Sequence, residues 1–300
     1  GAVSRAEKPV CRSNEEKMKN KLHHLSKTTR KSGVSYGLLI FMLIGGLVPG
    51  QALCGCASAD KGQTAAIVSG ETEKKSIGVI AAMESEMNAL VSRMSDVKEV
   101  VIGSSKFAQG KLAGKEMVVG LSGIGKTAAA RTTTAMILGF EPEAVINVGV
   151  AGGLLDSQNV CDLVISDSMI QADFDLSPID GPSGIGLQYK ADEKLMKLAE
   201  QAAKELGVNY SVGAIASQDL FMARDEDFNK LMNQFPQSVC SEMEGAAVAS
   251  AAAAFNVPVL VLRSLSDVVH HQDNPMEYSQ FEETAAQRAA DLMEKMCPQL

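Results

Sequence analysis

Acidic side chains that could act in acid and base chemistry stand at the ends of several apolar segments. Glu242 and Glu244 lie where an alanine-rich helix opens, and Asp267 ends the apolar segment 257–267 that follows it. Glu86 lies near the start of an earlier predicted helix, at the edge of its apolar face. Carboxyl groups beside apolar chain must be solvated, paired or used in chemistry, so these four acids are candidate catalytic groups.

Three of these acids also have an explanation that needs no chemistry. Acids at the first turn of a helix interact favourably with the helix macrodipole, which accounts for Glu242 and Glu244. An acid that follows a strand, as Asp267 does, is often the N-cap of the next segment. The choice between these explanations depends on whether the acids meet in space.

The segment 120–127, Gly-Leu-Ser-Gly-Ile-Gly-Lys-Thr, matches the GxxxxGK[ST] pattern of phosphate-binding loops. It has the strand before it and the helix after it that such a loop requires. However, the only later strand that ends in a candidate magnesium ligand is 163–166, followed by Asp167, and this signal is weak. We therefore favour a second interpretation, in which the glycines let the backbone approach a small ligand.

Short apolar strands alternate with helices over about 220 residues, a pattern typical of one α/β domain. Strands are predicted at 76–82, 97–102, 106–112, 117–121, 144–150, 163–166, 212–216 and 257–267, and helices at 83–94, 126–138, 192–206, 226–233, 241–254 and 281–296. The run 257–262 suits a strand that is covered on both faces, and ligands of such sheets bind beyond the carboxyl ends of the strands. The sequence predicts a single-domain, three-layer α/β sandwich around a central, mixed, largely parallel twisted sheet, with Ser266 and Asp267 at its ligand-binding edge.

The N-terminal region has the layout of a secretory signal. Residues 1–36 hold nine Lys and Arg and three acids, and the apolar run 37–48 is too short to span a bilayer. Leu-Cys-Gly-Cys at 53–56 resembles a bacterial lipobox, with Cys56 as the lipidated residue. We expect an N-terminal extension and lipoprotein-type signal peptide at 1–55, a polar tether at 56–75 and the catalytic domain at 76–300. The expected product is an exported, membrane-anchored bacterial lipoprotein.

Charge and cysteine usage exclude several classes of partner. Residues 56–300 carry 19 Lys and Arg against 33 Asp and Glu, a formal charge of −14, so nucleic acid is not an expected partner. Cys161, Cys240 and Cys297 are widely spaced and predict buried thiols rather than a metal site. His270 and His271 are adjacent on a loop and point apart, so they predict no metal site either.

Five segments occur together in an order and spacing that resemble the 5'-methylthioadenosine/S-adenosylhomocysteine nucleosidases of the nucleoside phosphorylase superfamily. They are 77–86, 122–126, 147–153, 241–249 and 263–267. The resemblance covers about residues 76–296 and includes the glycine loop, which displaces the phosphate-loop interpretation. It implies hydrolysis of the bond between adenine and ribose, a homodimer, and no metal or organic cofactor.

The resemblance also implies a role for each matching residue. Glu86 would be the general base for the attacking water, and Asp267, with Ser266 beside it, would donate a proton towards adenine N7. Glu244 would bind the ribose hydroxyls. The remaining implied contacts are Met243 against the sugar, the backbone of Gly152 against the substrate, and Phe221 with the backbone of Met222 against the adenine. These roles fit the chemistry, which needs an acid at the purine, an anion near the sugar and a base for water.

One residue departs from the family pattern, and two other functions stay open. Val150 stands where family members often carry a hydroxyl near the water. A purine nucleoside phosphorylase is the nearest alternative, but it needs cationic phosphate ligands where this chain has Glu86. An exported nucleoside-binding or adhesion protein that kept the same scaffold is the other alternative.

Overall fold

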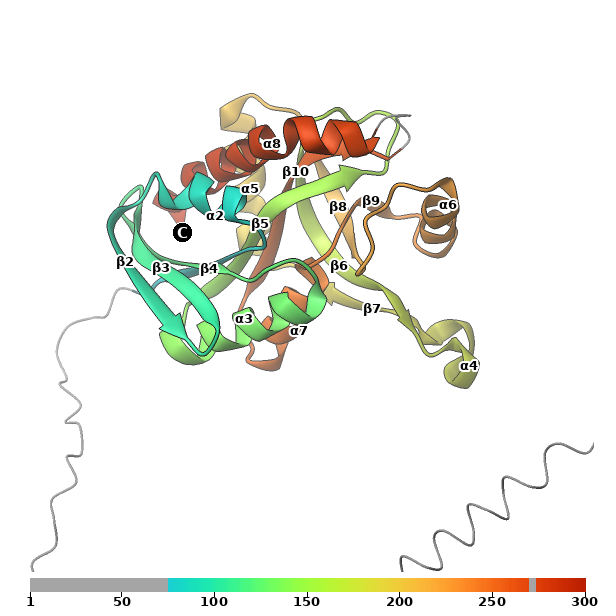
Figure 1. The fold of residues 1–300 in the computed structure, drawn as a ribbon, viewed down its shortest axis with the longest axis horizontal. Coiled ribbons are helices and arrows are strands. Elements are labelled where there is room, and N and C mark those ends of the chain that lie inside the picture. Colours follow the sequence, from blue (N-terminus) through green and yellow to red (C-terminus); the bar gives the residue numbers. More distant parts are fainter. Residues whose placement is uncertain (1–74, 270–273) are drawn as a thin grey trace, which may run out of the picture. The chain divides into compact units, whose positions relative to one another are not determined.

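Ten strands form one mixed sheet in the computed structural model, which describes residues 75–269 and 274–300 (Figure 1). The strands are β1 Ile77–Ala81, β2 Ser95–Ile102, β3 Ser105–Leu112, β4 Lys115–Leu121, β5 Ala144–Gly153, β6 Leu163–Asp175, β7 Ile185–Lys190, β8 Tyr210–Ser217, β9 Ser238–Glu242 and β10 Val259–Val268. The predicted signal peptide, the tether with Cys56, and His270 and His271 lie outside the described residues.

Strands β1, β5 and β10 form the parallel centre of the sheet, and they are buried along nearly their whole length, as strands between two layers must be. Every residue of β10 is buried. Strand β5 lies between β1 and β10 over its first half, so the carboxyl ends of these strands meet at one edge. That edge is where Ser266 and Asp267 were expected.

The sheet partly returns on itself, a feature that the sequence did not predict. The final residues of β5 pair with β9, which continues through β8 and β6 to β10, and β10 pairs again with β5. This ring of five strands brings residues from β5, β9 and β10 around a common space. Strand ends that an open sheet would spread apart are thereby held together.

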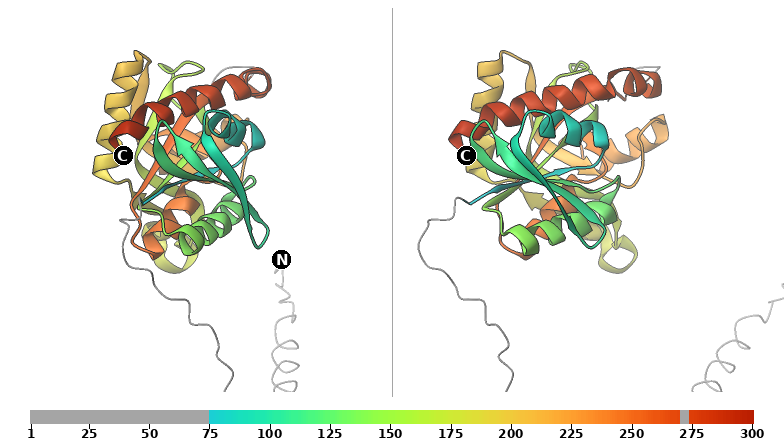
Figure 2. Two further views of the ribbon diagram at one scale, coloured as in Figure 1. Left: turned by 90° about the vertical axis from the view of Figure 1, so that its left-hand side faces the viewer. Right: turned by 60° about the vertical axis from the view of Figure 1, so that its left-hand side comes forward.

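Helices cover both faces of the sheet, which confirms the predicted three-layer arrangement (Figure 1). Helices α2 Glu84–Val91, α5 Glu193–Leu206 and α8 Asn274–Met296 lie on one face, and α3 Lys126–Phe140 and α7 Gly245–Ala254 lie on the other. Both views in Figure 2 keep α2 and α8 on the side of the sheet opposite α3. Each face has its own apolar core, one with residues of α2, α5 and α8 and one with residues of α3 and α7. A third, smaller apolar cluster surrounds α6 Asp225–Gln234.

Three local predictions from the sequence were wrong. Residues 241 and 242 end strand β9 rather than open a helix, because β9 pairs with β5 and β8, and α7 begins only at Gly245. Between 166 and 192, where no element was predicted, the chain forms the short helix α4 Ser177–Asp180 and then β7. Helix α8 begins at Asn274, several residues before the predicted start.

Candidate active site

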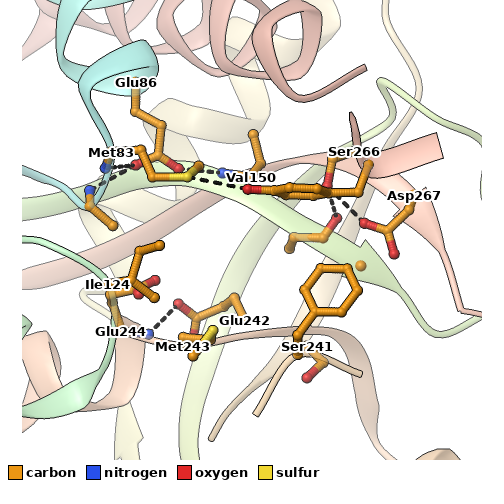
Figure 3. A pocket seen from close by; sticks show the side chains of 15 residues that line it. Met83, Glu86, Ile124, Val150, Ser241, Glu242, Met243, Glu244, Ser266 and Asp267 are labelled. Carbon is orange, nitrogen blue, oxygen red and sulfur yellow. Dashed lines mark hydrogen bonds between the residues drawn. The ribbon is translucent and has the colours of Figure 1, made fainter. Parts of the chain in front are cut away.

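A pocket of about 240 Å³ opens at the carboxyl ends of β5 and β10 (Figure 3). This volume is slightly below the roughly 300–1,000 Å³ that is usual for small-molecule sites. Seven predicted site residues line it: Glu86, Gly152, Phe221, Met243, Glu244, Ser266 and Asp267. Figure 3 shows Glu86 and Glu244 on opposite sides of the hollow and Asp267 at its far end. The three acids that lie far apart in the sequence thus meet around one space.

The Glu86 carboxylate is fixed by main-chain donors. The N–H groups of Ala82 and Met83 donate to its Oε2 at 2.7 and 3.0 Å, and the N–H of Val150 donates to its Oε1 at 3.0 Å (Figure 3). Burial raises the pKa of Glu86, and the Arg263 cation and the three N–H groups oppose that rise. A carboxylate in this setting is oriented and is a stronger base than one in water.

Strand β5 leaves space for Glu86 only because residue 149 is glycine. A Cβ at Gly149 would lie 2.5 Å from Glu86 Oε1 and 3.2 Å from Arg263 Nη1. The glycine therefore lets the carboxylate and the guanidinium lie directly against the strand.

Arg263 supplies a buried positive charge among the acids. Its Nη2 donates to Glu242 Oε2 at 2.5 Å and to Asn147 Oδ1 at 2.6 Å, and it lies 3.8 Å from Glu244 Oε2. Burial opposes this charge, but the surrounding carboxyls outweigh burial and raise the pKa of Arg263. The guanidinium is therefore charged and compensates part of the negative charge in the pocket.

Glu244 occupies the turn between β9 and α7. Its Oε1 accepts the N–H of Gly125 at 2.8 Å, which ties the glycine loop to this acid. Burial raises the pKa of Glu244 to about 8, and the charge of Glu242 adds to the rise while Arg263 opposes it. The protonated form of this carboxyl therefore persists to a higher pH than that of an ordinary glutamate.

Asp267 lies at the end of β10, with its side chain against β5. The Ser266 hydroxyl donates to Asp267 Oδ1 at 2.8 Å (Figure 3). A Cβ at Gly152 would lie 3.1 Å from Asp267 Oδ2, so the glycine allows this close approach. Ser266 and Gly152 thus fix where the carboxyl lies.

Aromatic and sulfur-containing side chains form the apolar walls of the pocket. Phe221 and Tyr278 make an edge-to-face contact with ring centroids 5.3 Å apart, and the Tyr278 hydroxyl donates to Met83 Sδ at 3.3 Å. Burial raises the pKa of Tyr278 to about 12, so the phenol stays protonated. The Met222 side chain does not line the pocket; it is buried in the third apolar cluster with Phe228. Met222 is thus the one predicted site residue of the domain that is not among the residues lining the pocket.

The glycine loop binds carboxylates in this structure. The N–H of Gly125 donates to Glu244, and the N–H of Lys126 donates to Asp219 Oδ1 at 2.8 Å. The Lys126 amine pairs with Asp173, which also accepts the N–H of Asp219. The donors that a phosphate-binding loop would direct at phosphate are thus bound to acids, which favours the second interpretation of this segment.

The described residues contain neither a metal-binding cluster nor a membrane-spanning helix. Within residues 75–269 and 274–300, no three metal-ligating side chains are grouped closely enough to hold an ion. Among those same residues, no helix has both the length and the apolar character that crossing a bilayer requires.

The sequence interpretation missed Arg263, Asn147 and Tyr278. A signal for Arg263 was present, since it is a single cation within the apolar run of β10, and a buried Arg must be paired. Asn147 is likewise a single polar residue within β5. No signal marked Tyr278, because α8 shows no special pattern at its first turns.

Comparisons with known proteins agree with this architecture. The phosphorylase superfamily model matches residues 76–297. The 5'-methylthioadenosine/S-adenosylhomocysteine nucleosidase of Geobacillus thermodenitrificans is 41% identical over 223 residues, which are 73% of this chain and 94% of that protein. The nucleosidase of the same name from Aeromonas salmonicida is 37% identical over 229 residues, 75% of this chain and 99% of that protein.

Solved structures show the same likeness. The nucleosidase of Neisseria meningitidis in complex with methylthio-immucillin-A matches with a TM-score of 0.72 and 33% identity, over 75% of this chain and 100% of that chain. The futalosine hydrolase of Helicobacter pylori matches with a TM-score of 0.71 and 34% identity, over 76% of this chain and 99% of that chain. Since the family model spans nearly all of the described residues and the relatives match along almost their full length, the chain belongs to the 5'-methylthioadenosine/S-adenosylhomocysteine nucleosidases of the phosphorylase superfamily.

Proposed function

We propose that this protein hydrolyses the N-glycosidic bond of 5'-methylthioadenosine, S-adenosylhomocysteine and related 5'-deoxyadenosines and releases adenine. The observation that carries the proposal is the meeting of Glu86, Glu244 and Asp267 in one pocket. Cleavage of this bond places positive charge on the sugar and negative charge on the departing purine. Three separated carboxyls offer one group each for the water, the sugar and the purine.

Glu86 is the proposed general base for the attacking water. Its three main-chain donors hold it against the pocket, and burial raises its pKa toward the range in which it can take a proton from water. Val150 lines the pocket beside it without a hydroxyl group. The orientation of the water therefore rests on Glu86 rather than on a side chain at position 150.

Asp267 is the proposed donor of a proton towards adenine N7, with the Ser266 hydroxyl fixing its carboxyl group. Glu244 would bind the ribose hydroxyls. The remaining proposed contacts are Met243 against the sugar, the Gly152 backbone against the substrate, and Phe221 with the Met222 backbone against adenine. Protonation of the purine makes it a better leaving group, and an anion near the sugar stabilises the developing positive charge.

The direct experiment is adenine release by the purified protein in phosphate-free buffer containing a metal chelator. We expect release from methylthioadenosine and adenosylhomocysteine, with Glu86→Gln and Asp267→Asn variants reduced by roughly 10²–10⁴-fold, as is usual for loss of a general acid or base. Glu205→Gln is the matched control, since Glu205 forms a surface ion pair with Lys295. Absence of adenine release from every substrate would contradict the proposal.

Phosphorolysis is the main alternative, and strict dependence of adenine release on added phosphate would support it. Phosphate needs unpaired cations, whereas Arg263 is already bound to Glu242 and Asn147 and Glu86 would repel an anion. A binding protein on the same scaffold would bind nucleosides but release no adenine. Futalosine belongs among the tested substrates, because a futalosine hydrolase is 34% identical to this chain and shares its fold.

We further propose that the protein is exported and anchored to a membrane through a lipid on Cys56. The family match begins at residue 76, so the basic and apolar segments before it are additional to the enzyme domain. Labelled fatty acid should be incorporated into the wild-type protein and into Cys54→Ser, but not into Cys56→Ser. Equal labelling of both variants would contradict Cys56 as the lipidated residue.

A homodimer is also proposed. It is supported by the exposure of apolar side chains near α4, where Ile179 is 81% exposed and Leu176 is 39% exposed. Isolated apolar residues on the surface are common, so the direct measurement is the mass in solution by sedimentation. A dimer that Ile179→Glu converts to a monomer is expected, and a wild-type monomer at micromolar concentration would contradict the proposal.

A further inference from the structure

Glu242 is a buried pocket residue with no part in the chemistry proposed above. Its Oε1 accepts from the Ser217 hydroxyl, and its Oε2 accepts from Arg263 Nη2 at 2.5 Å, from the Glu244 N–H at 2.9 Å and from the Gly245 N–H at 2.8 Å. Both oxygens are thus occupied by protein donors. Glu242 is placed to organise its neighbours rather than to contact substrate.

The Arg263 guanidinium lies between two acids but is shared unequally. Its Nη2 is 2.5 Å from Glu242 Oε2 and 3.8 Å from Glu244 Oε2. We propose that Glu242 is a positioning residue, which binds Arg263 so closely that it sets the charge that Glu244 presents to the ribose. This inference rests on the proposed function, because it concerns the residue assigned to the ribose hydroxyls.

Charged and titratable groups reach Glu244 from several elements. They are Glu242 on β9, Arg263 and Asp267 on β10, Glu86 on α2, Tyr278 on α8, and the N–H of Gly125 before α3. Arg263 is the one cation among these groups, and Glu242 takes its shortest contact. The rise in the pKa of Glu244 to about 8 has burial as its first cause and the Glu242 charge as its second. Removal of the Glu242 charge therefore lowers the pKa of Glu244.

Glu242→Gln is the test variant, because it removes the charge with little change in shape. The amide oxygen can still accept from Arg263 and the two N–H groups, and the amide nitrogen can donate to the Ser217 oxygen. In the profile of kcat/KM against pH for methylthioadenosine, one limb reports the titration of Glu244. That limb should move to lower pH by about one unit, while the rest of the profile stays as in the wild type. Glu205→Gln, a surface change of the same type, should leave the limb in place. A uniform fall of kcat/KM at every pH, with no displacement of the limb, would overturn the proposal.

A second variant and a second measurement keep the test independent of folding and of activity. Glu242→Asp keeps the charge but withdraws it from Arg263 by one methylene, so the same limb should move in the same direction by less. Carbon-13 titration of the glutamate carboxyls, with Glu244→Gln used to assign the signal, reads the pKa of Glu244 directly. A displaced Glu244 signal in protein that releases no adenine would uphold the role of Glu242 and reject the proposed function. A Glu244 signal that stays in place in protein that still releases adenine would reject the role of Glu242 and uphold the proposed function.

Discussion

Gly149→Ala should weaken catalysis through a single methyl group. The new Cβ would lie 2.5 Å from Glu86 Oε1, and Cβ atoms essentially never approach another atom within 3.0 Å, so the carboxylate must withdraw by about 0.5 Å. The Val150 N–H is already 3.0 Å from that oxygen, so the same displacement stretches this hydrogen bond to the limit at which it is lost.

The size of the effect follows from the bond that is lost. A hydrogen bond to a charged group contributes about 1.5–3 kcal/mol, which corresponds to roughly a 10- to 150-fold fall in kcat/KM if the orientation of Glu86 depends on it. The Val150 N–H also lowers the pKa of Glu86. Its loss should therefore move the limb of the pH profile that reports Glu86 to higher pH, opposite to the displacement expected for Glu242→Gln.

The assay is adenine release over a range of pH, with the thermal unfolding midpoint measured on the same samples. Gly213→Ala is the matched control, since its Cβ would lie 2.7 Å from Val239 Cγ1, an apolar clash away from the pocket. The control should lower the unfolding midpoint and leave kcat/KM and its pH dependence as in the wild type. The argument would be refuted if Gly149→Ala had the same kcat/KM as the wild type, or if the limb of its pH profile that reports Glu86 stayed at the wild-type pH.

Three further predictions concern charge. Arg263→Met removes the cation from Glu242 and Glu244 and should lower the free energy of unfolding by about 3–5 kcal/mol, measured by urea unfolding. Because the pKa of Glu244 rises from 4.5 to about 8 on folding, its stabilising contribution is full below 4.5 and is lost as pH rises through 8. The fall in the urea midpoint over this interval should therefore be smaller in Glu244→Gln. Lys126→Ala should retain adenine release because its amine pairs with Asp173, whereas loss of activity would favour the phosphate-loop interpretation.

The fold was predictable where the apolar pattern is local. The run Val259–Leu262 and the run Ile77–Ala81 are buried on both faces, and each was visible as an uninterrupted apolar segment. Strand β9 was not visible, because Ser-Val-Cys-Ser-Glu has neither an apolar run nor a clear alternation. It is a strand because β8 and β5 pair with it, and such contacts between distant segments leave no mark in the local sequence.

The acids of the pocket were predictable because they follow strands or open helices, whereas their partners depend on strand register. Parallel pairing of β10 with β5 sets Arg263 beside Gly149 and Val261 beside Asn147. A shift of that register by one residue would turn Arg263 to the other face of the sheet. Residue type alone therefore indicated a buried cation in need of a partner but could not identify the partner.

The main chain explains how the pocket can hold three buried carboxyls. Burial of an ionised carboxyl is costly unless donors replace the lost water. Glu86 and Glu244 accept backbone N–H groups, and Asp267 accepts the hydroxyl of the adjacent Ser266. Gly149 and Gly152 leave room for Glu86 and Asp267 against β5, and Gly125 donates its N–H to Glu244. Most of these donors are backbone groups, at the end of β1, on β5 and at the start of α3, so the positions of Glu86 and Glu244 follow from the fold of the main chain. Neighbouring charges such as Arg263 and Glu242 then change the pKa of each acid.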